Sequence, residues 1–383
     1  MTTVGRVFGF DLLRCLAIVL VLITHTLLFI SPGLYRPPVY TGLFGVEFFF
    51  VLSGFLIGTI LLKIYHQTEG LTWSSLKVFW IRRWFRTLPN YYLMFLVYAI
   101  LIYGSHHLNV FSQIKYLSYL VFLQNSVHYQ PNNFFPVAWS LSIEEWFYLI
   151  FPLLLFLLTS LFKKNKAAAF LSAILVLILA ELTLRLFIAL TKNMYWDEGF
   201  RKLMPVRLDS IAIGVLAAYI KFHCPAFWNK KANLTATVGI FMLIALSVYF
   251  SFQYVRYFDP ITWDHLFNPK LFLKTLFLTS LSFSIALLFP YLDKLPSPPN
   301  FVARPITFIS KISYSIYLSH YFIILILSHI FVHLPAFKYN NLILFVVIWL
   351  AVVSISAVQY HFFEVKATAL RNRFSKRQTE IKI

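Results

Sequence analysis

The chain has 383 residues, of which 60% are hydrophobic and 12% are charged, and its mean hydropathy is +0.74. This composition excludes an ordinary soluble domain and is typical of a protein that crosses a membrane several times. The formal net charge is +19, but the basic residues are scattered among short loops without a nucleic-acid-binding module, so we expect no nucleic-acid partner. The two cysteines, Cys15 and Cys224, exclude a disulfide framework and a cysteine metal site, and we expect no metal.

Long apolar segments predict an all-α polytopic membrane protein with about ten transmembrane helices. The expected helices lie near residues 8–30, 43–63, 89–104, 138–162, 167–190, 207–222, 235–252, 271–289, 311–332 and 342–363. The first segment is too long for a signal peptide and lacks a small-x-small cleavage site, so we expect it to remain in the mature protein. Residues 114–123 are apolar but too short to cross alone, which indicates a re-entrant or interfacial segment.

Lysine and arginine residues indicate the orientation. If the N-terminus is cytoplasmic, most of them fall on the cytoplasmic side, as the positive-inside rule favours. We therefore expect both termini in the cytoplasm, with a membrane domain over residues 1–365 and a basic cytoplasmic tail over residues 366–383 that also contacts anionic headgroups. No low-complexity linker separates a second domain, so the membrane domain is expected to carry the function.

Two ionisable residues stand inside the first expected helix. Arg14 and His25 are eleven residues apart, so they face nearly the same side and lie ~16 Å apart along the axis. Ionisable groups are rare in lipid unless they face a protein interior or a watery cavity. A snorkelling Arg14 and an interfacial His25 would explain the pair without any function.

Further ionisable residues are expected in the same outer layer of the membrane as His25. They are Glu47, Glu144, Glu145, Glu181, Arg185, Arg207 and Asp209. A layer of this kind has no evident packing use in lipid and therefore indicates a site. Glu144 and Glu145 point about 100° apart on a helix, so one can face the interior while the other reaches the interface.

Several of these residues also have structural explanations. Glu181 and Arg185 are spaced i,i+4, and we favour a structural ion pair between them. Asp209 could cap its helix and hold Arg207, and Glu47 could hydrogen-bond a neighbouring backbone group.

His320 and two glycines of the second expected helix also have structural explanations. For His320, near mid-membrane, we favour a satisfied core histidine. Gly54 and Gly58 form a small-xxx-small face that permits close helix contact.

A basic and aromatic segment precedes the third expected helix. It holds Arg82, Arg83 and Arg86 between Trp80 and Pro89. Arginines interleaved with aromatic residues are typical of an interfacial anchor, but their planar forks also suit phosphate oxygens. Because Arg14 would open on the same cytoplasmic side, an anionic ligand from the cytoplasm would find its counter-charges there.

Several motifs occur in a fixed order along the chain. They are the arginine-x10-histidine of Arg14 and His25, the segment GVEFFFVLSGFL at 45–56, the arginine-x-x-arginine of Arg83 and Arg86, WSLSIEEWFY at 139–148 followed by Pro152, RLDS at 207–210 with Gly214, and SYSIYLSH at 313–320. Together they resemble the acyltransferase-3 family of membrane acyltransferases over spans one to nine. One departure is Phe363-Glu364-Val365, where the family usually has Glu-x-Pro or a similar ending, which leaves the role of Glu364 open. Some relatives carry an attached esterase-like domain, for which we expect no room here.

The resemblance implies transfer of an acyl group, usually acetyl, from cytoplasmic acyl-CoA to a hydroxyl of an exported or surface glycan or lipid-linked saccharide, in a bacterial inner (plasma) membrane. No permanently bound cofactor is expected. Arg82, Arg83 and Arg86 would hold the CoA phosphates, and Arg14 would line the entrance.

The expected catalytic residues are His25 and Glu144. The unperturbed pKa of histidine, near 6.5, suits removal of a proton from an acceptor hydroxyl, and formation of an acyl-histidine is the alternative. Glu144 would orient His25 or stabilise its protonated form. The expected wall of the site comprises Glu47, Glu145, Arg207, Asp209 and His320.

The main competing function is a transporter or flippase for an anionic or polar metabolite, because a charged cavity among ten helices also serves transport. A transporter should contain inverted repeats or paired broken helices, and the sequence shows neither. The concentration of ionisable residues argues against a non-catalytic scaffold or receptor.

Overall fold

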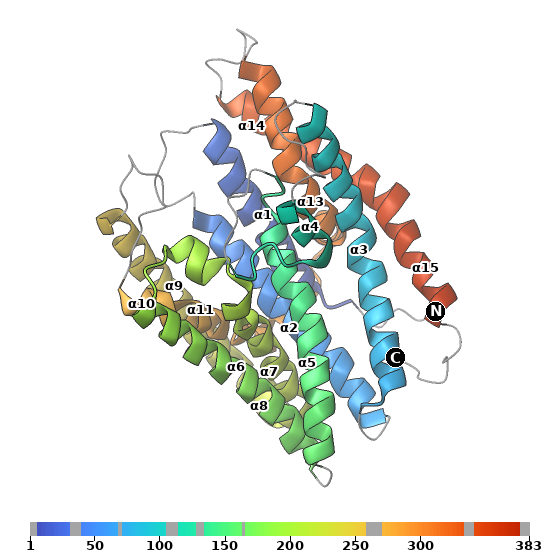
Figure 1. Cartoon of the computed structure of the whole chain (residues 1–383), viewed down its shortest axis with the longest axis vertical. Helices are drawn as coiled ribbons and strands as arrows, with labels where there is room; N and C mark the ends of the chain where they lie inside the picture. The colour runs from blue at the N-terminus through green and yellow to red at the C-terminus, as the bar shows by residue number, and fades with distance from the viewer. Residues whose placement is uncertain are drawn as a thin grey trace.

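The computed structural model describes residues 6–30, 40–67, 71–104, 114–127, 134–162, 165–257, 270–332 and 341–375, and every element in these ranges is a helix (Figure 1). Within these ranges, seven helices are long and apolar enough to cross a membrane, by length and composition. They are α1 (Phe8–Ile30), α2 (Thr41–Gln67), α5 (Ala138–Leu161), α6 (Lys166–Thr191), α9 (Ala232–Tyr257), α13 (Asn300–Val332) and α14 (Asn341–Gln359) with the turns that continue it. The all-α class is confirmed.

The remaining predicted helices are also helical, with different bounds. Helix α3 (Trp73–Gly104) begins well before residue 89, so the segment with the three arginines is its first half. Helix α7 (Leu208–His223) is short, and the predicted helix at 271–289 is divided into α10 (Leu271–Thr275), α11 (Phe277–Ala286) and α12 (Phe289–Leu292). Shorter elements are η4 (Asp197–Arg201), η5 (Met204–Val206) and α8 (Pro225–Lys230).

The breaks in the 271–292 segment have identifiable causes. Arg185 donates from Nη1 to the Thr275 carbonyl at 2.6 Å, and Trp196 donates from Nε1 to the Leu273 carbonyl at 2.8 Å. Side chains that take helix carbonyls interrupt the i→i−4 ladder, so α10 ends at Thr275. Pro290 has no N–H to donate to the preceding turn, and the chain starts again at α12.

Helices α2 and α7 pack closely through glycine. A Cβ atom on Gly54 would lie 1.9 Å from the Ile211 carbonyl oxygen, and one on Gly214 would lie 2.0 Å from that of Val51. The same approach continues at Gly58, next to Val215. The predicted small-residue face of α2 is therefore confirmed, and α7 is its partner.

The apolar segment at 114–123 forms α4 (Ile114–Leu117) and η3 (Ser118–Val121). Phe122 follows with a φ of 60°, and its carbonyl accepts hydrogen bonds from Ser142 Oγ and Trp146 Nε1 of α5 at 2.6 and 2.9 Å. Tyr91 of α3 donates to the Tyr119 carbonyl at 2.9 Å. Neighbouring helices thus satisfy this non-crossing backbone, as irregular backbone at membrane depth requires.

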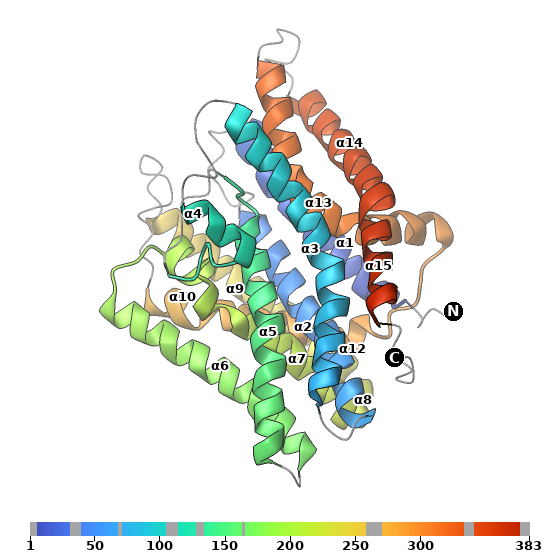
Figure 2. The same cartoon turned by 45° about the vertical axis from the view of Figure 1, so that its right-hand side comes forward.

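The last helices run back along the molecule. Helix α14 packs against α13, continues through the π-helical turn η6 (Tyr360–Glu364) and becomes α15 (Val365–Ser375), which lies beside α3 (Figure 2). The predicted boundary between domain and tail at residues 365 and 366 therefore falls within continuous helix. Residues 376–383 of that tail lie outside the described residues.

Candidate active site

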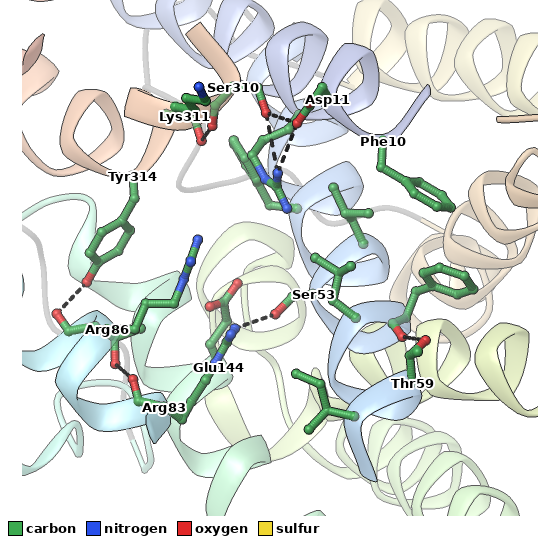
Figure 3. A pocket seen from close by; sticks show the side chains of 18 of the residues that line it. Phe10, Asp11, Ser53, Thr59, Arg83, Arg86, Glu144, Ser310, Lys311 and Tyr314 are labelled. Carbon is green, nitrogen blue, oxygen red and sulfur yellow. Dashed lines mark hydrogen bonds and ion pairs between the residues drawn. The ribbon is translucent and has the colours of Figure 1, made fainter. Parts of the chain in front are cut away.

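A large cavity lies between α1, α2, α3, α5, α13 and α15 (Figure 3). Its volume is about 1140 Å³. The cationic residues on its wall are Arg6, Arg14, Lys63, Arg83, Arg86, Lys221, Lys311 and Arg371, and the acidic ones are Asp11, Glu144, Asp293 and Glu364. Because cations outnumber carboxylates, the cavity suits an anionic ligand.

One wall carries a polar network built on Tyr148 of α5. The Tyr148 hydroxyl accepts a hydrogen bond from Arg83 Nη2, donates to Glu144 Oε2 at 2.7 Å and lies 2.6 Å from Ser53 Oγ. The Arg83 guanidinium also lies over the Tyr148 ring, 4.3 Å from its centroid. Arg83 and Glu144, both predicted site residues, are therefore brought together through a tyrosine.

The three arginines of α3 do not behave alike. Arg83 is held by Tyr148 and Ser53, whereas the exposed side chain of Arg86 lines the cavity. Arg82, although within the described residues, is not among those that line the cavity. Arg86 is therefore the member of the group best placed to meet a ligand.

Arg14 lies near the end of the cavity formed by the start of α1. It donates from Nη1 to Ser310 Oγ of α13 at 3.3 Å and lies 3.6 Å from the Asp11 carboxylate. Asp11 also accepts two hydrogen bonds from Arg6, at 2.6 and 2.7 Å. Arg14 therefore lies on the cavity wall, and its role on the route of an anionic ligand stays a prediction.

Glu364, whose role the motif comparison left open, also lines the cavity. Its Oε2 accepts hydrogen bonds from Ser315 Oγ at 2.6 Å and from Asn90 Nδ2 at 3.2 Å. Asn90 in turn accepts from Gln359 at 2.6 Å. In the sequence, Glu364 directly follows the last predicted helix, at 342–363. A residue in a loop there would be solvated, whereas in the structure the helix continues through η6 and Glu364 faces the cavity.

His25 packs against α13 and is not among the described residues that line the cavity. Its Nδ1 is 3.0 Å from the Val21 carbonyl oxygen and 3.2 Å from His320 Nε2. Tyr317 lines the cavity, and its ring centroid lies 5.9 Å from that of His320. Glu144 bonds to Tyr148, so the side chain that contacts His25 is His320 rather than the predicted Glu144.

Two other predicted wall residues, Glu47 and Arg207, form a buried ion pair. Arg207 donates from Nη2 to both carboxylate oxygens of Glu47, at 2.7 and 2.6 Å, and Ser210 and Ser282 complete the Glu47 shell at 2.7 and 2.9 Å. The side chains of Glu47 and Arg207 are 1% and 0% exposed. Among the described residues that line the cavity neither appears, which indicates a structural role.

The pairing of Arg185 and Asp209 differs from the prediction. Arg185 Nη2 lies 2.6 Å from Asp209 Oδ2, while Glu181 is 3.4 Å from the Leu208 backbone N–H. Asp209 also accepts from Thr279 at 2.6 Å and provides no cap for α7. The favoured Glu181–Arg185 pair and the Asp209 cap were both wrong, because tertiary contacts between α6, α7 and α11 satisfy these groups.

Glu145 points away from the cavity. It is buried, and Glu144 rather than Glu145 is on the cavity wall. The choice between these neighbours, open from the sequence, is resolved by the rotation of α5.

The described segment after α6 is well packed. Trp196 is buried and bonds to the Leu273 carbonyl, so it is a core residue. Asp197 forms ion pairs with Arg201 and Lys202. Burial alone would raise the pKa of Asp197, but these two cations outweigh it and hold the pKa below its usual value.

The fold and site define a class of protein: in the described residues, an all-helical, apolar domain with a cationic cavity, one of whose wall residues, Tyr317, neighbours His320. The family model described as "Acyltransferase domain" matches residues 7–361. The chain therefore belongs to the acyltransferase-3 family, as its motifs predicted.

Two similar relatives come from Staphylococcus aureus. O-acetyltransferase OatA of strain NCTC 8325 is 26% identical over 354 residues, and the protein of strain COL named "Putative O-acetyltransferase SACOL0978" is 28% identical over 350. Each alignment covers 86% of this chain and 53% of the relative, so the chain spans about half the length of these relatives. No solved structure matches the chain.

Proposed function

We propose that this protein is a membrane O-acetyltransferase that moves an acetyl group from cytoplasmic acetyl-CoA to a hydroxyl of an exported or surface saccharide. The observation that carries the proposal is a cationic cavity whose wall includes Tyr317, the neighbour of His320, which in turn lies 3.2 Å from His25. Membership of the acyltransferase-3 family supports the acyl chemistry. The names of the bacterial relatives favour acetyl as the acyl group. The long apolar helices, together with the bacterial source of these relatives, favour a bacterial plasma (inner) membrane as the location.

The charges along the cavity suit the polarity of acyl-CoA, which has phosphates at one end and a thioester at the end of a long arm. Arg14, Arg86, Lys311 and Arg371 offer counter-charges to the phosphates. Phe49, Ser140 and Tyr317 line the inner end. A thioester there would approach His25 once Tyr317 moves aside.

At the reaction centre, His25 is proposed to act as the general base. Its imidazole takes the proton of the acceptor hydroxyl while the oxygen attacks the thioester carbonyl carbon. The C–S bond then breaks, and the CoA thiolate leaves and takes up a proton. Glu144 is proposed to act from the cavity wall by holding Tyr148 and Arg83 in place.

The directions of neighbouring helices support ten crossings with both ends on one side. Helices α1 and α13 run in the same direction, because Arg14 meets Ser310 and His25 meets His320. Helices α13 and α14 run in opposite directions, because Ser315 meets Glu364 and Ser319 meets Ser356. If successive spans alternate in direction, the first and ninth spans are parallel and the ninth and tenth are antiparallel. Helices α1, α13 and α14 correspond to these three spans and have these directions.

The contact between α2 and α7 gives a further parallel pair, as the second and sixth spans require. Arg6 and Arg371, close to the two ends of the described chain, line the same cavity. Together with the excess of basic residues on that side, these contacts favour cytoplasmic termini.

Two measurements test the proposal. Purified protein in membranes should release CoA from acetyl-CoA when a saccharide acceptor is present, and His25→Ala should abolish this release while the protein remains inserted. Mass spectrometry of surface saccharides from cells with and without the gene should show one added acetyl group. Movement of a solute without consumption of acetyl-CoA would instead establish a transporter.

A further inference from the structure

We propose that His320 is a positioning residue that fixes the tautomer of His25 and shares the proton that His25 accepts. This inference rests on the proposed role of His25 as base, and it assigns the supporting part to an imidazole instead of a carboxylate. The observation behind it is the direct contact of the two rings, whose centroids lie 4.9 Å apart at an interplanar angle of 55°.

The hydrogen bonds determine which nitrogens carry protons. His320 Nδ1 lies 3.0 Å from the Ile316 carbonyl oxygen, and His25 Nδ1 lies 3.0 Å from that of Val21. A carbonyl oxygen only accepts, so both Nδ1 atoms carry hydrogen when the rings are neutral. His320 Nε2 then has a lone pair directed at the His25 Nδ1–H, 3.2 Å away.

The consequence for His25 is a fixed tautomer. With hydrogen held on Nδ1 by two acceptors, His25 Nε2 keeps its lone pair, which is the form that a general base requires. In many enzymes a carboxylate or a carbonyl oxygen sets the tautomer of a functional histidine through its second ring nitrogen. Here the Val21 carbonyl and His320 Nε2 do so together.

The same geometry provides a place for the proton. When His25 Nε2 takes the acceptor proton, His25 Nδ1 can pass its own hydrogen to His320 Nε2, which leaves His320 as the imidazolium and His25 neutral. His320 would then donate from both nitrogens, to Ile316 O and to His25 Nδ1. The reverse transfer returns the proton for the departing thiolate, so the exchange balances.

Charged and titratable groups surround the pair. Tyr317 and Tyr321 of α13 flank the rings, and the cations that act on His25 are Arg201 and Lys202.

A core histidine with no part in the reaction is the competing explanation, and substitutions separate the two. His320→Gln keeps an acceptor oxygen for the His25 Nδ1–H but cannot take a proton, whereas His320→Leu provides neither. His329→Gln is the matched control, because His329 is an exposed residue of the same helix.

The experiment measures kcat, KM for acetyl-CoA and the pH profile of kcat on the full chain in membranes. We expect His320→Leu to lower kcat by about 100-fold and His320→Gln by about 10-fold, as expected for general base catalysis and its supporting groups. KM should change less than about twofold. His320→Gln should also move the acidic limb of the pH profile, and His329→Gln should match the wild type.

Equal kcat for His320→Leu and wild type would overturn the inference, as would equal losses in the two His320 variants. If His320→Leu does not fold, a wild-type kcat and pH profile in His320→Gln would overturn it.

An independent readout is the nitrogen NMR spectrum of the chain labelled with ¹⁵N-histidine, assigned with His25→Ala. It should show His25 with hydrogen on Nδ1 in the wild type and a mixture of tautomers in His320→Leu. This measurement reports the tautomer of His25 even if the wild type transfers no acetyl group. It therefore distinguishes failure of this inference from failure of the proposed function.

Discussion

Tyr148 and Glu144 lie one turn apart on α5, and the tyrosine hydroxyl donates to the glutamate carboxylate at 2.7 Å. The same hydroxyl accepts from Arg83, so the carboxylate and the guanidinium compensate one another through a neutral group. This arrangement leaves both charges on the wall of the cavity.

Glu144→Gln should therefore weaken the reaction without unfolding the protein. Glutamine keeps an acceptor for Tyr148 but removes the negative charge near Arg83, and we expect kcat/KM for acetyl-CoA to fall by about 10-fold, the effect of one lost charged hydrogen bond. Steady-state CoA release measures this. Glu145→Gln, one residue along but off the cavity wall, is the control, and an equal loss there would contradict the role of the cavity.

The arginines of α3 give a second prediction. Arg86→Ala should raise KM for acetyl-CoA by about 10- to 100-fold, because a charged hydrogen bond to a phosphate is worth about 1.5–3 kcal/mol. Arg82→Ala should leave KM within about twofold, since Arg82 is not on the cavity wall. Equal effects of the two substitutions would favour the interfacial anchor, and a membrane-insertion assay would then show lower insertion of both.

The buried Glu47–Arg207 pair predicts a loss of stability. Glu47→Gln removes the carboxylate that accepts both hydrogen bonds from Arg207 Nη2 and leaves Arg207 with the more distant carboxylate of Asp209, 3.9 Å away. We expect the free energy of unfolding to fall by about 3–5 kcal/mol. Lys221→Gln breaks the partly exposed pair with Asp293 and should cost about 1 kcal/mol or less. Denaturant unfolding in micelles compares the stability of the two variants. A Glu47→Gln variant as stable as the wild type would show that this pair does not stabilise the fold.

The contact between α2 and α7 gives a prediction about packing. Gly214→Ala would place a methyl group 2.0 Å from the Val51 carbonyl oxygen, which is backbone and cannot rotate away. The helices must separate, so we expect a lower yield of folded protein and a lower melting temperature. At Gly42 the nearest atoms belong to the Thr24 side chain, at 3.0 Å or more. Gly42→Ala should therefore be the milder substitution in the same size-exclusion and melting assays.

Much of the fold was predictable from apolar run lengths, because backbone groups in lipid must be satisfied within helices. The interruption at Thr275 was not predictable, since it depends on Arg185, a residue 90 positions away. Arg185 also illustrates why local spacing failed. The i,i+4 neighbour Glu181 was available, but Asp209 from another helix takes the ion pair.

For the site, the spacing of residues along one helix predicted which of them share a face. The sequence did not predict which residues of other helices would contact them. The eleven-residue interval placed Arg14 and His25 on the same helix face, and both meet α13, at Ser310 and His320. Which side chain would reach His25 depended on how α13 packs on α1. That packing put an imidazole there and left Glu144 on the cavity wall.

The cavity is assembled from residues far apart in the sequence, because Arg6 and Asp11 face it from the start of α1 and Glu364 and Arg371 face it from η6 and α15. During synthesis the first helix must therefore wait, with its arginine and histidine already in the bilayer, until the closing segment leaves the ribosome. The nascent chain has no complete cavity before that moment, so membrane insertion of α1 and the onset of ligand binding are separated by the synthesis of every helix from α2 to α15.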